Sequence, residues 1–362
     1  MKLAVAAENP IERLVLALGI PPVTLMETHI SFLRARAIMV GTKLGVFEAV
    51  AAHPLAAGEV AARCRTSPVA TAKLLNALVG SGYLRFSGGA YALTPHARKW
   101  VTRESPHSLR DKVLFEFVEW ALVERVEDYV RSGQPLDMHE TDSEEQWALY
   151  QRAMRALAGV GVPEVVRRTP VPPGAAAMLD IGGSHGYIAV AMCRRYEALR
   201  AVVLDLPAAI PHAAPILAAE AMADRVVHRA GNALADDLGD AAWDLVVVSQ
   251  LLHHFDEAAC RNLLRRIARA LRPGGISVVL ELVRPRSPND AGQVGALLDL
   301  YFALTSQSGT WSIEEINAWQ RGAELHPMKP IHLRTVPGAA LVVAKKPQRA
   351  PRDSGRGSIM RA

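Results

Sequence analysis

The stretch AMLDIGGSHG, residues 177–186, decides the fold of this chain of 362 residues. A short apolar run, 177–181, leads directly into three glycines within five residues. Glycine has no β-carbon, so the backbone of such a turn can approach a ligand closely, and the helix expected from Tyr187 presents its N-terminal amides to the turn. Taken alone, the stretch fits a cofactor-binding turn and a tight strand-to-helix connection equally well.

Length and composition predict a globular protein with two domains. Half of the residues are hydrophobic, which is enough for a large core. No apolar run approaches the ~18 residues that a membrane helix needs, and the apolar residues 3–7 are too few for a signal peptide. We therefore expect a cytoplasmic protein that binds no membrane. The three cysteines are far apart and show no metal or redox spacing.

The basic charge is concentrated at one end of the chain. The net charge is +5, and residues 345–362 hold six basic residues and one acidic residue, so the rest of the chain is neutral. A segment rich in Pro, Gly, Ser and Arg is typical of a disordered tail. We expect such a tail at 347–362, and we favour it over a contact with a polyanion.

The first 105 residues predict a winged-helix domain. The expected elements are helices at 11–20, 25–50, 57–64 and 68–79, followed by a hairpin of strands 83–86 and 90–93. Ser67 and Pro68 form a helix start. The helix that they open offers Lys73 as its only cation, which is too little for a DNA reader. We therefore predict no nucleic-acid partner, and a homodimer formed through the apolar helices.

The second half of the chain predicts a doubly wound parallel sheet. Residues 106–170 form a helical linker, and the sequence PVPPG after it marks the start of a domain at 171–346. Short apolar strands then alternate with helices. Strands are expected at 177–181, 201–206, 225–230, 244–251, 276–282, 330–336 and 340–344, and helices at 187–195, 208–221, 257–271, 290–306 and 313–322. Ligands of such sheets bind beyond the carboxyl ends of the strands.

Two polar residues follow neighbouring strands at that edge. Asp205 ends the second strand, where a carboxylate can accept both hydroxyls of a ribose, although a helix N-cap or a surface acid has the same pattern. Asn232 follows the third strand, where its amide can contact an adenine edge, although Gly-Asn is also an ordinary turn. The glycine turn one strand earlier favours the cofactor interpretation.

Two histidines follow the fourth strand, in the segment SQLLHHF at 249–255. Imidazole as a side chain is suited to proton transfer, and His253 and His254 would both lie where the ligand binds, although one of them can be purely structural. Neighbours on an extended chain point in opposite directions, and no carboxylate cluster accompanies them. We therefore expect no metal.

Together these motifs resemble the S-adenosylmethionine-dependent O-methyltransferases of the class I fold. The motifs are LDIGGSHG at 179–186, Asp205-Leu206, Gly231-Asn232, LHHF at 252–255, LRPGG at 271–275 and Glu281, in this order. The branch most similar methylates small molecules, carries a winged-helix dimerisation domain, and includes plant caffeate and isoflavone enzymes and bacterial natural-product tailoring enzymes. The resemblance spans nearly the whole chain.

The resemblance implies a fold and a reaction. The fold is α/β, with a Rossmann-like doubly wound sheet and an N-terminal α-helical winged-helix dimerisation domain. The cofactor is S-adenosylmethionine, with S-adenosylhomocysteine as product, and the acceptor is a small aromatic or hydrophobic molecule bound with the help of the linker. O-methylation is the reaction expected.

The resemblance also implies site residues. The expected cofactor contacts are Asp180, Gly182, Gly183, Ser184, Gly186, Asp205, Leu206, Asn232, Ala233 and Ser249. The expected acceptor contacts are Tyr150, Met154, His185, Asp299 and Trp311. His253 is expected to be the general base, with Glu281 orienting its ring and His254 beside it.

Four residues depart from the family pattern. Ser184-His185 replaces a small residue and Thr, His254 replaces Asp, and Trp311 stands where a second orienting glutamate is expected. Since an indole does not stabilise an imidazolium as a carboxylate does, a C- or N-methyltransferase, or a tailoring enzyme that transfers no methyl, remains an alternative. A non-catalytic winged-helix regulator is a third, against which the neutral body and the scarcity of cations argue.

Overall fold

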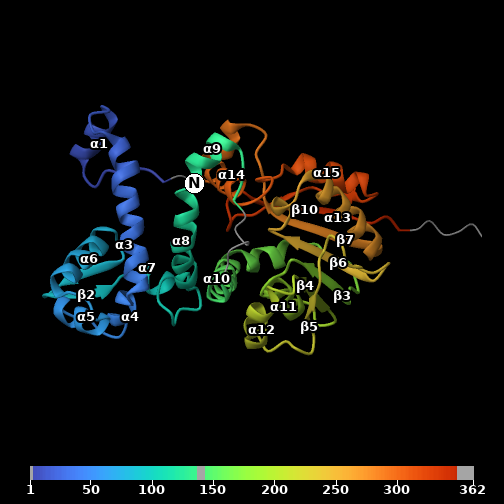
Figure 1. Cartoon of the computed structure of the whole chain (residues 1–362), viewed down its shortest axis with the longest axis horizontal. Coiled ribbons are helices and arrows are strands. Elements are labelled where there is room, and N and C mark those ends of the chain that lie inside the picture. Colours follow the sequence, from blue (N-terminus) through green and yellow to red (C-terminus); the bar gives the residue numbers. More distant parts are fainter. Residues whose placement is uncertain (1–2, 137–142, 349–362) are drawn as a thin grey trace, which may run out of the picture.

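The computed structural model describes residues 3–136 and 143–348 (Figure 1). An N-terminal helical part lies at one end of the molecule and a large sheet flanked by helices lies at the other, with the middle helices between them. Most of the tail expected at 347–362 falls outside the described residues, which end at 348.

The N-terminal part is helical and ends in a hairpin. Its elements are α1 (Pro10–Ala17), α2 (Val23–Leu25), a π-helical turn η1 (Met26–Ile30), α3 (Ser31–Lys43), α4 (Val46–Ala49), α5 (Ala57–Cys64), α6 (Pro68–Gly80), the hairpin β1 (Leu84–Ser87) and β2 (Ala90–Leu93), and α7 (Pro95–Trp100). The helix-turn-helix and hairpin confirm the winged-helix prediction. The single helix expected over 25–50 is wrong, because Gly45 adopts a left-handed conformation with φ of 76° and separates α3 from α4.

Three helices connect the two ends of the molecule: α8 (Arg110–Val123), α9 (Val126–Ser132) and α10 (Glu144–Arg168). The start of α10 is fixed by Ser143, whose side chain accepts from the Gln146 N–H while the Gln146 side chain accepts from the Ser143 N–H. This helix packs along α8 and α11 and so joins the middle of the molecule to the sheet.

The second half forms an eight-stranded sheet in the order β5-β4-β3-β6-β7-β10-β8, with β9 paired to β10. The strands are β3 (Ala177–Ile181), β4 (Arg200–Asp205), β5 (Val226–Ala230), β6 (Trp243–Ser249), β7 (Leu271–Leu282), β8 (His326–Pro327), β9 (Ile331–His332) and β10 (Ala339–Lys345). The first five are parallel, and β10 runs antiparallel to β7. The predicted doubly wound sheet is confirmed.

Helices cover both faces of this sheet. They are α11 (Tyr187–Arg195), α12 (Ile210–Ala219), α13 (Glu257–Ala270), α14 (Pro288–Thr305) and α15 (Ile313–Gly322), with a 3-10 turn η2 (Leu252–His254) before α13. One apolar core joins the sheet to α10, α11 and α12, and the other joins it to α13 and α15. Burial on both faces explains why these strands read as continuous apolar runs in the sequence.

Two strand predictions are wrong. The strand expected at 330–336 is reduced to β9, because the N–H groups of Arg334 and Thr335 donate to the carboxylate of Glu164 on α10 at 2.9 and 2.8 Å. The strand expected to reach 251 stops at Ser249, because Gln250 turns the chain with φ of 50°.

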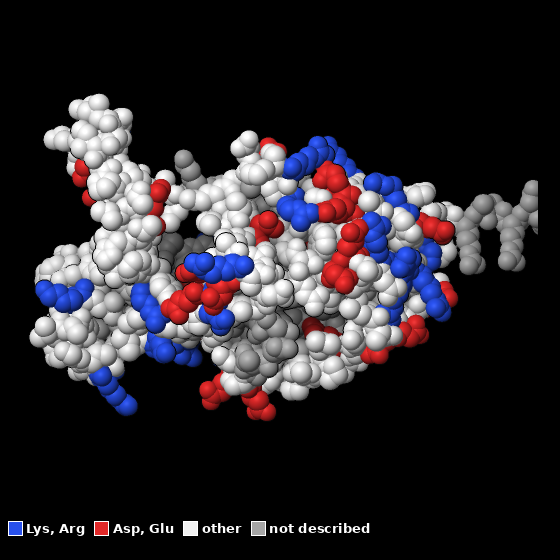
Figure 2. Space-filling view, turned by 45° about the horizontal axis from the view of Figure 1, so that its top comes forward, with Lys and Arg blue, Asp and Glu red and all other residues white. Residues whose placement is uncertain are grey.

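Charge is unevenly distributed over the surface. In Figure 2 the projecting N-terminal end shows hardly any Lys or Arg, whereas basic and acidic side chains alternate over the sheet end of the molecule. In the part of the chain that the structure describes, no helix combines the length and the apolar character needed to cross a bilayer. The cytoplasmic location stays a prediction.

Candidate active site

The turn after β3 has a left-handed backbone, which favours glycine, at two of its glycines. Gly182 and Gly186 have φ of 64° and 72°. At Gly183 a β-carbon would lie 2.6 Å from Cγ of the Asp180 side chain, so the turn folds directly onto the strand that precedes it. Ser184 between them is also left-handed, with φ of 51°. The sequence AMLDIGGSHG thus produces a strained, closely packed turn at the carboxyl end of β3.

Ser184 is held in this conformation by contacts on three sides. Its N–H donates to Asp205 Oδ2 at 2.7 Å, and its carbonyl accepts from His228 Nε2 at 2.8 Å. Its hydroxyl forms a hydrogen bond with Gln151 of α10. The other oxygen of Asp205 accepts from the Leu206 N–H at 2.7 Å. The ends of β3, β4 and β5 are therefore bound to one another at the glycine turn.

Asp180 lies beneath the turn and is fully buried. Burial, and to a smaller extent the nearby charge of Asp205, raise the pKa of this carboxyl group, while the backbone N–H of Ala189 partly offsets them, so that the pKa lies at about 7. A carboxyl group in this position carries a proton far more readily than an exposed one.

His185 turns inward, against α10. Its Nδ1 accepts from the Tyr187 N–H at 3.1 Å. Burial, followed by the charges of Arg155 and His228, lowers the pKa of the imidazole, and a hydrogen bond to the Met154 backbone opposes them; the pKa is about 3 as a result. The ring is therefore neutral and fixed between the glycine turn and the helix that carries Met154.

Asn232 and Ala233 follow β5 at the same edge of the sheet, as expected. The Asn232 side-chain oxygen accepts from the Leu234 N–H at 2.9 Å, and the backbone N–H of Asn232 donates to Asp236 Oδ2 at 2.7 Å. Ser249, at the end of β6, is partly exposed. These contacts order the loop and leave the Asn232 side chain exposed.

The segment after β6 is organised by Glu281 of β7. One oxygen of its carboxylate accepts from the N–H groups of Leu251 and Leu252, at 2.8 and 2.7 Å. The other oxygen lies 3.0 Å from His253 Nδ1, and the two side chains are only 1% and 4% exposed. A carboxylate oxygen only accepts, so Nδ1 carries the proton and the lone pair is on Nε2.

Two aromatic rings pack against the buried imidazole. The centroids of the His254 and Phe302 rings each lie 4.3 Å from that of His253. Phe302 belongs to α14, and the sequence analysis did not single it out. Its position within the apolar helix expected at 290–306 gave no sign that it would contact a residue nearly 50 positions earlier.

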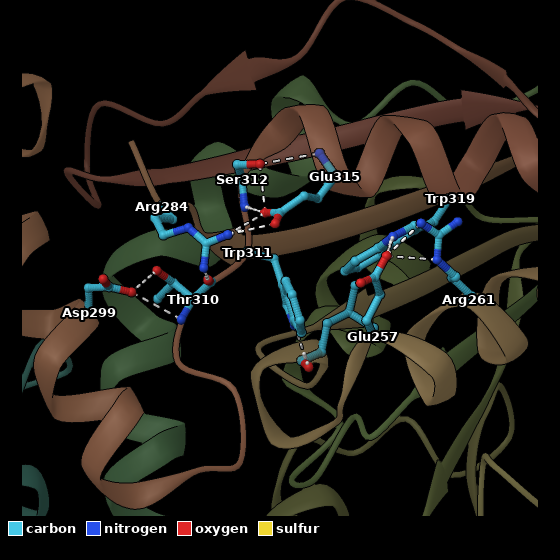
Figure 3. A network of polar contacts seen from close by, with 10 residues as sticks. Glu257, Arg261, Arg284, Asp299, Thr310, Trp311, Ser312, Glu315 and Trp319 are labelled. Atoms are coloured by element: carbon cyan, nitrogen blue, oxygen red, sulfur yellow. Dashed lines mark hydrogen bonds and ion pairs between the residues drawn. The ribbon is translucent and has the colours of Figure 1, made fainter. Parts of the chain in front are cut away.

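Trp311 lies beside this segment, and Asp299 lies on the other side of the loop that carries Trp311 (Figure 3). The Trp311 indole N–H donates to the Leu252 carbonyl at 3.0 Å. Asp299 Oδ1 accepts from the Thr310 N–H at 3.1 Å and from the Thr310 hydroxyl. The structure thus places Trp311 against the turn that carries His253, and Asp299 against the loop that carries Trp311.

The two remaining expected acceptor contacts lie on α10. The Tyr150 ring meets Phe115 of α8 edge-on at 5.5 Å and Trp147 at 5.8 Å. Met154, one turn later, is partly buried next to His185. Tyr301 of α14 donates to Glu119 of α8 at 3.1 Å, a pair that the sequence did not reveal.

The residues at this edge fit S-adenosylmethionine. The glycine turn offers backbone close to a ligand, and the carboxylate of Asp205 lies at the end of the neighbouring strand β4, the place where such folds hold a ribose. Among the described residues no group of three or more His, Cys, Asp or Glu side chains is arranged to hold a metal ion. A doubly wound sheet with a glycine turn after β3 and a carboxylate at the end of β4 defines a class I methyltransferase. The buried pair of His253 and Glu281 lies after β6 and on β7 of the same sheet.

The chain belongs to the O-methyltransferase family. Residues 118–319 match the O-methyltransferase domain, and residues 26–103 match the O-methyltransferase dimerisation domain. The resemblance seen in the sequence is confirmed, and the protein is an S-adenosylmethionine-dependent methyltransferase.

Individual relatives agree with this assignment. The acetylserotonin O-methyltransferase of Bos taurus is 30% identical over 298 residues, which cover 75% of this chain and 82% of that protein. The N,N-dimethyltransferase OxyT of Streptomyces rimosus is 26% identical over 335 residues, covering 90% and 96%. The structure of human N-acetylserotonin methyltransferase in complex with SAM has the same fold, with a TM-score of 0.79, 20% identity, and coverage of 95% of this chain and 100% of that one.

Proposed function

We propose that this enzyme methylates a hydroxyl oxygen of a small aromatic molecule, with His253 as general base. The observation that carries the proposal is the buried contact of 3.0 Å between His253 Nδ1 and Glu281 Oε2. It fixes the tautomer and leaves Nε2 as the basic atom.

The cofactor and the residues of the site have separate roles in this reaction. S-adenosylmethionine, when bound, supplies an activated methyl group. The glycine turn and Asp205 hold the cofactor, while Nε2 of His253 accepts the hydroxyl proton and Glu281 stabilises the imidazolium that results. A phenol near pKa ~10 and an imidazole near ~6.5 differ by a few units, which is tolerable when the proton leaves as the methyl arrives.

An aromatic acceptor suits the surroundings of His253. The helices α8, α10 and α14 bring aromatic side chains together on this side of the molecule: Phe115, Trp147, Tyr150, Tyr301 and Phe302. Pockets for small ligands are lined mainly by such side chains, with few polar groups. Relatives named for acetylserotonin, a tetracenomycin polyketide and a hydroxynaphthoate support this acceptor class.

The test is product formation. The purified protein is incubated with S-adenosylmethionine and a panel of phenols, hydroxyindoles and aromatic amines, and S-adenosylhomocysteine is quantified. We expect it to form with at least one hydroxylated acceptor, and the methylated product to carry the new methyl on oxygen. A product methylated on nitrogen or carbon throughout the panel would reject O-methylation and support the second candidate.

That second candidate, an N- or C-methyltransferase, rests on two observations. Trp311 occupies the position where a second carboxylate was expected, and OxyT, which aligns with 90% of this chain, is named an N,N-dimethyltransferase. An amine that is already neutral needs less help from a base than a hydroxyl does. NMR of the methylated product distinguishes the candidates directly.

We also propose that two copies associate through the N-terminal helices. These belong to the segment that matches the dimerisation domain or precede it directly. They expose large apolar side chains: Ile11, Leu14, Leu18, Ile20, Leu25, Met26, Ile30, Phe32 and Leu33. An apolar surface of this kind on a projecting end with few cations suits a partner of the same kind. Light scattering should give twice the mass of the chain, and a monomer would contradict the proposal.

A further inference from the structure

We propose that Trp311 is a positioning residue for the base: its indole N–H holds the Leu252 carbonyl and, through it, the backbone of His253. The inference rests on the proposed role of His253 in proton transfer. It concerns how the base is oriented in a chain where a tryptophan takes the place of an expected carboxylate.

The Leu252 residue is held at both of its peptide groups. Its N–H donates to Glu281 Oε1 at 2.7 Å. Its carbonyl accepts from Trp311 Nε1 at 3.0 Å and from the Phe255 N–H at 3.0 Å. Because this carbonyl and the His253 N–H belong to one planar peptide group, fixing the carbonyl fixes the plane from which the His253 side chain extends.

Trp311 is itself firmly anchored, as Figure 3 shows. Its carbonyl accepts from the Arg284 N–H at 2.9 Å, and the residue forms a β-bridge with Val283. The Arg284 guanidinium donates to both oxygens of Glu315, at 2.6 and 2.7 Å, and to the Thr310 carbonyl at 3.0 Å. Residues on both sides of Trp311 are thereby tied to Arg284.

The indole ring is also fixed from the side. It meets the Trp319 ring of α15 edge-on, with centroids 4.9 Å apart and planes at 78°. Ser312 begins α15 directly after Trp311, and its hydroxyl forms a capping box with Glu315. A donor with so little freedom loses little entropy when it binds the carbonyl.

Two residues near the end of β7, Glu281 and Arg284, therefore act on the base in different ways. Glu281 and Arg284 lie three residues apart at the end of β7 and just beyond it. Glu281 contacts the His253 ring and carries charge. Arg284 acts through Trp311, and the indole of Trp311 is a neutral donor that does not titrate. Within the described residues, Glu281 is the carboxylate recorded against the His253 ring. The orientation of the base is thus separable from its electrostatic stabilisation.

The experiment compares Trp311→Phe with the matched variant Trp243→Phe. Each substitution keeps an aromatic ring and removes one indole N–H that donates to a backbone carbonyl; that of Trp243, at the start of β6, donates to Leu238 at 2.6 Å and not to the histidine turn. We expect kcat of Trp311→Phe to fall ~5- to 10-fold, the worth of one hydrogen bond, with KM for the cofactor unchanged. The acid limb of the pH profile should keep its midpoint in Trp311→Phe and move to lower pH in Glu281→Gln.

A second readout does not need the acceptor. The His253 Nδ1 proton, buried in its contact with Glu281, should give a low-field NMR signal that is slow to exchange. We expect this signal to broaden in Trp311→Phe and to persist in Trp243→Phe. If both variants keep the wild-type signal and kcat, or if both lose them equally, the positioning role is rejected. Should the wild-type protein form no S-adenosylhomocysteine at all, the proposed function fails, while the NMR comparison still decides the role of Trp311.

Discussion

Replacing Asp180 with asparagine should change how the stability of the protein depends on pH. The Asp180 carboxyl is buried beneath the glycine turn, and its pKa is raised to about 7 from an ordinary value of 3.8. The folded protein therefore binds this proton more tightly than the unfolded chain does. The stabilisation from the protonated group is complete below the unfolded pKa and is lost as the pH rises through about 7.

The difference between these pKa values corresponds to at most ~4 kcal/mol of unfolding free energy. Asparagine has nearly the same shape and carries no charge at any pH. We expect Asp180→Asn to match the wild type near pH 4 and to exceed it in stability by up to that amount at pH 8.

The assay is urea unfolding of both proteins at several pH values between 4 and 8, followed by fluorescence. The difference between the two proteins is the quantity of interest, because other groups titrate equally in both. Asp237→Asn, at an exposed loop position, serves as the matched control. A difference that stays constant over the range, or that favours the wild type at high pH, would refute the reasoning.

Two further substitutions test the architecture of the turn and the contact between α10 and the chain after β9. Gly183→Ala should weaken cofactor binding by ~10-fold or more in calorimetry, because the new β-carbon would lie 2.6 Å from Asp180 Cγ. The control Gly58→Ala, which has open space around the new β-carbon, should bind the cofactor as the wild type does. Equal cofactor affinities of the two variants would contradict the prediction. Glu164→Gln should lower stability by ~1–3 kcal/mol at neutral pH. Burial acts to raise the pKa of Glu164, but hydrogen bonds from Thr335, Arg168 and Arg334 outweigh it and lower the pKa to about 2. The stabilisation by this carboxylate is therefore present above its ordinary pKa of 4.5 and is lost as the pH falls through about 2. When the wild type and Glu164→Gln are unfolded between pH 7 and 2, the difference between their unfolding free energies should become smaller in acid. A difference that grows in acid would exclude the stabilising role of the Glu164 carboxylate.

Local sequence determined much of the fold. The strand β3 was predicted at its observed bounds, because an apolar run of five residues ends at a glycine turn that fixes where it must stop. The start of α6 followed from Ser67 and Pro68 in the same way. The family, and with it the fold class and the cofactor, followed from the order of such motifs.

The omissions at the site, and one of the errors in the sheet, occurred where residues far apart in sequence meet. The chain after β9 gives its amides to Glu164, about 170 positions earlier, and so leaves the sheet. The contact of Trp311 with Leu252 spans 59 positions, and that of Phe302 with His253 nearly as many. No periodicity or capping signal encodes these contacts. The roles of the individual site residues stay predictions.

The central claim is that His253 accepts the acceptor's proton, and His253→Ala tests it most directly. Turnover to S-adenosylhomocysteine is measured beside the cofactor dissociation constant, with His326→Ala, at an exposed position on β8, as the control. Loss of a general base predicts a kcat lower by ~100-fold or more with unchanged cofactor affinity, and full activity of the control. A His253→Ala enzyme that binds the cofactor and turns over at the wild-type rate would contradict the account.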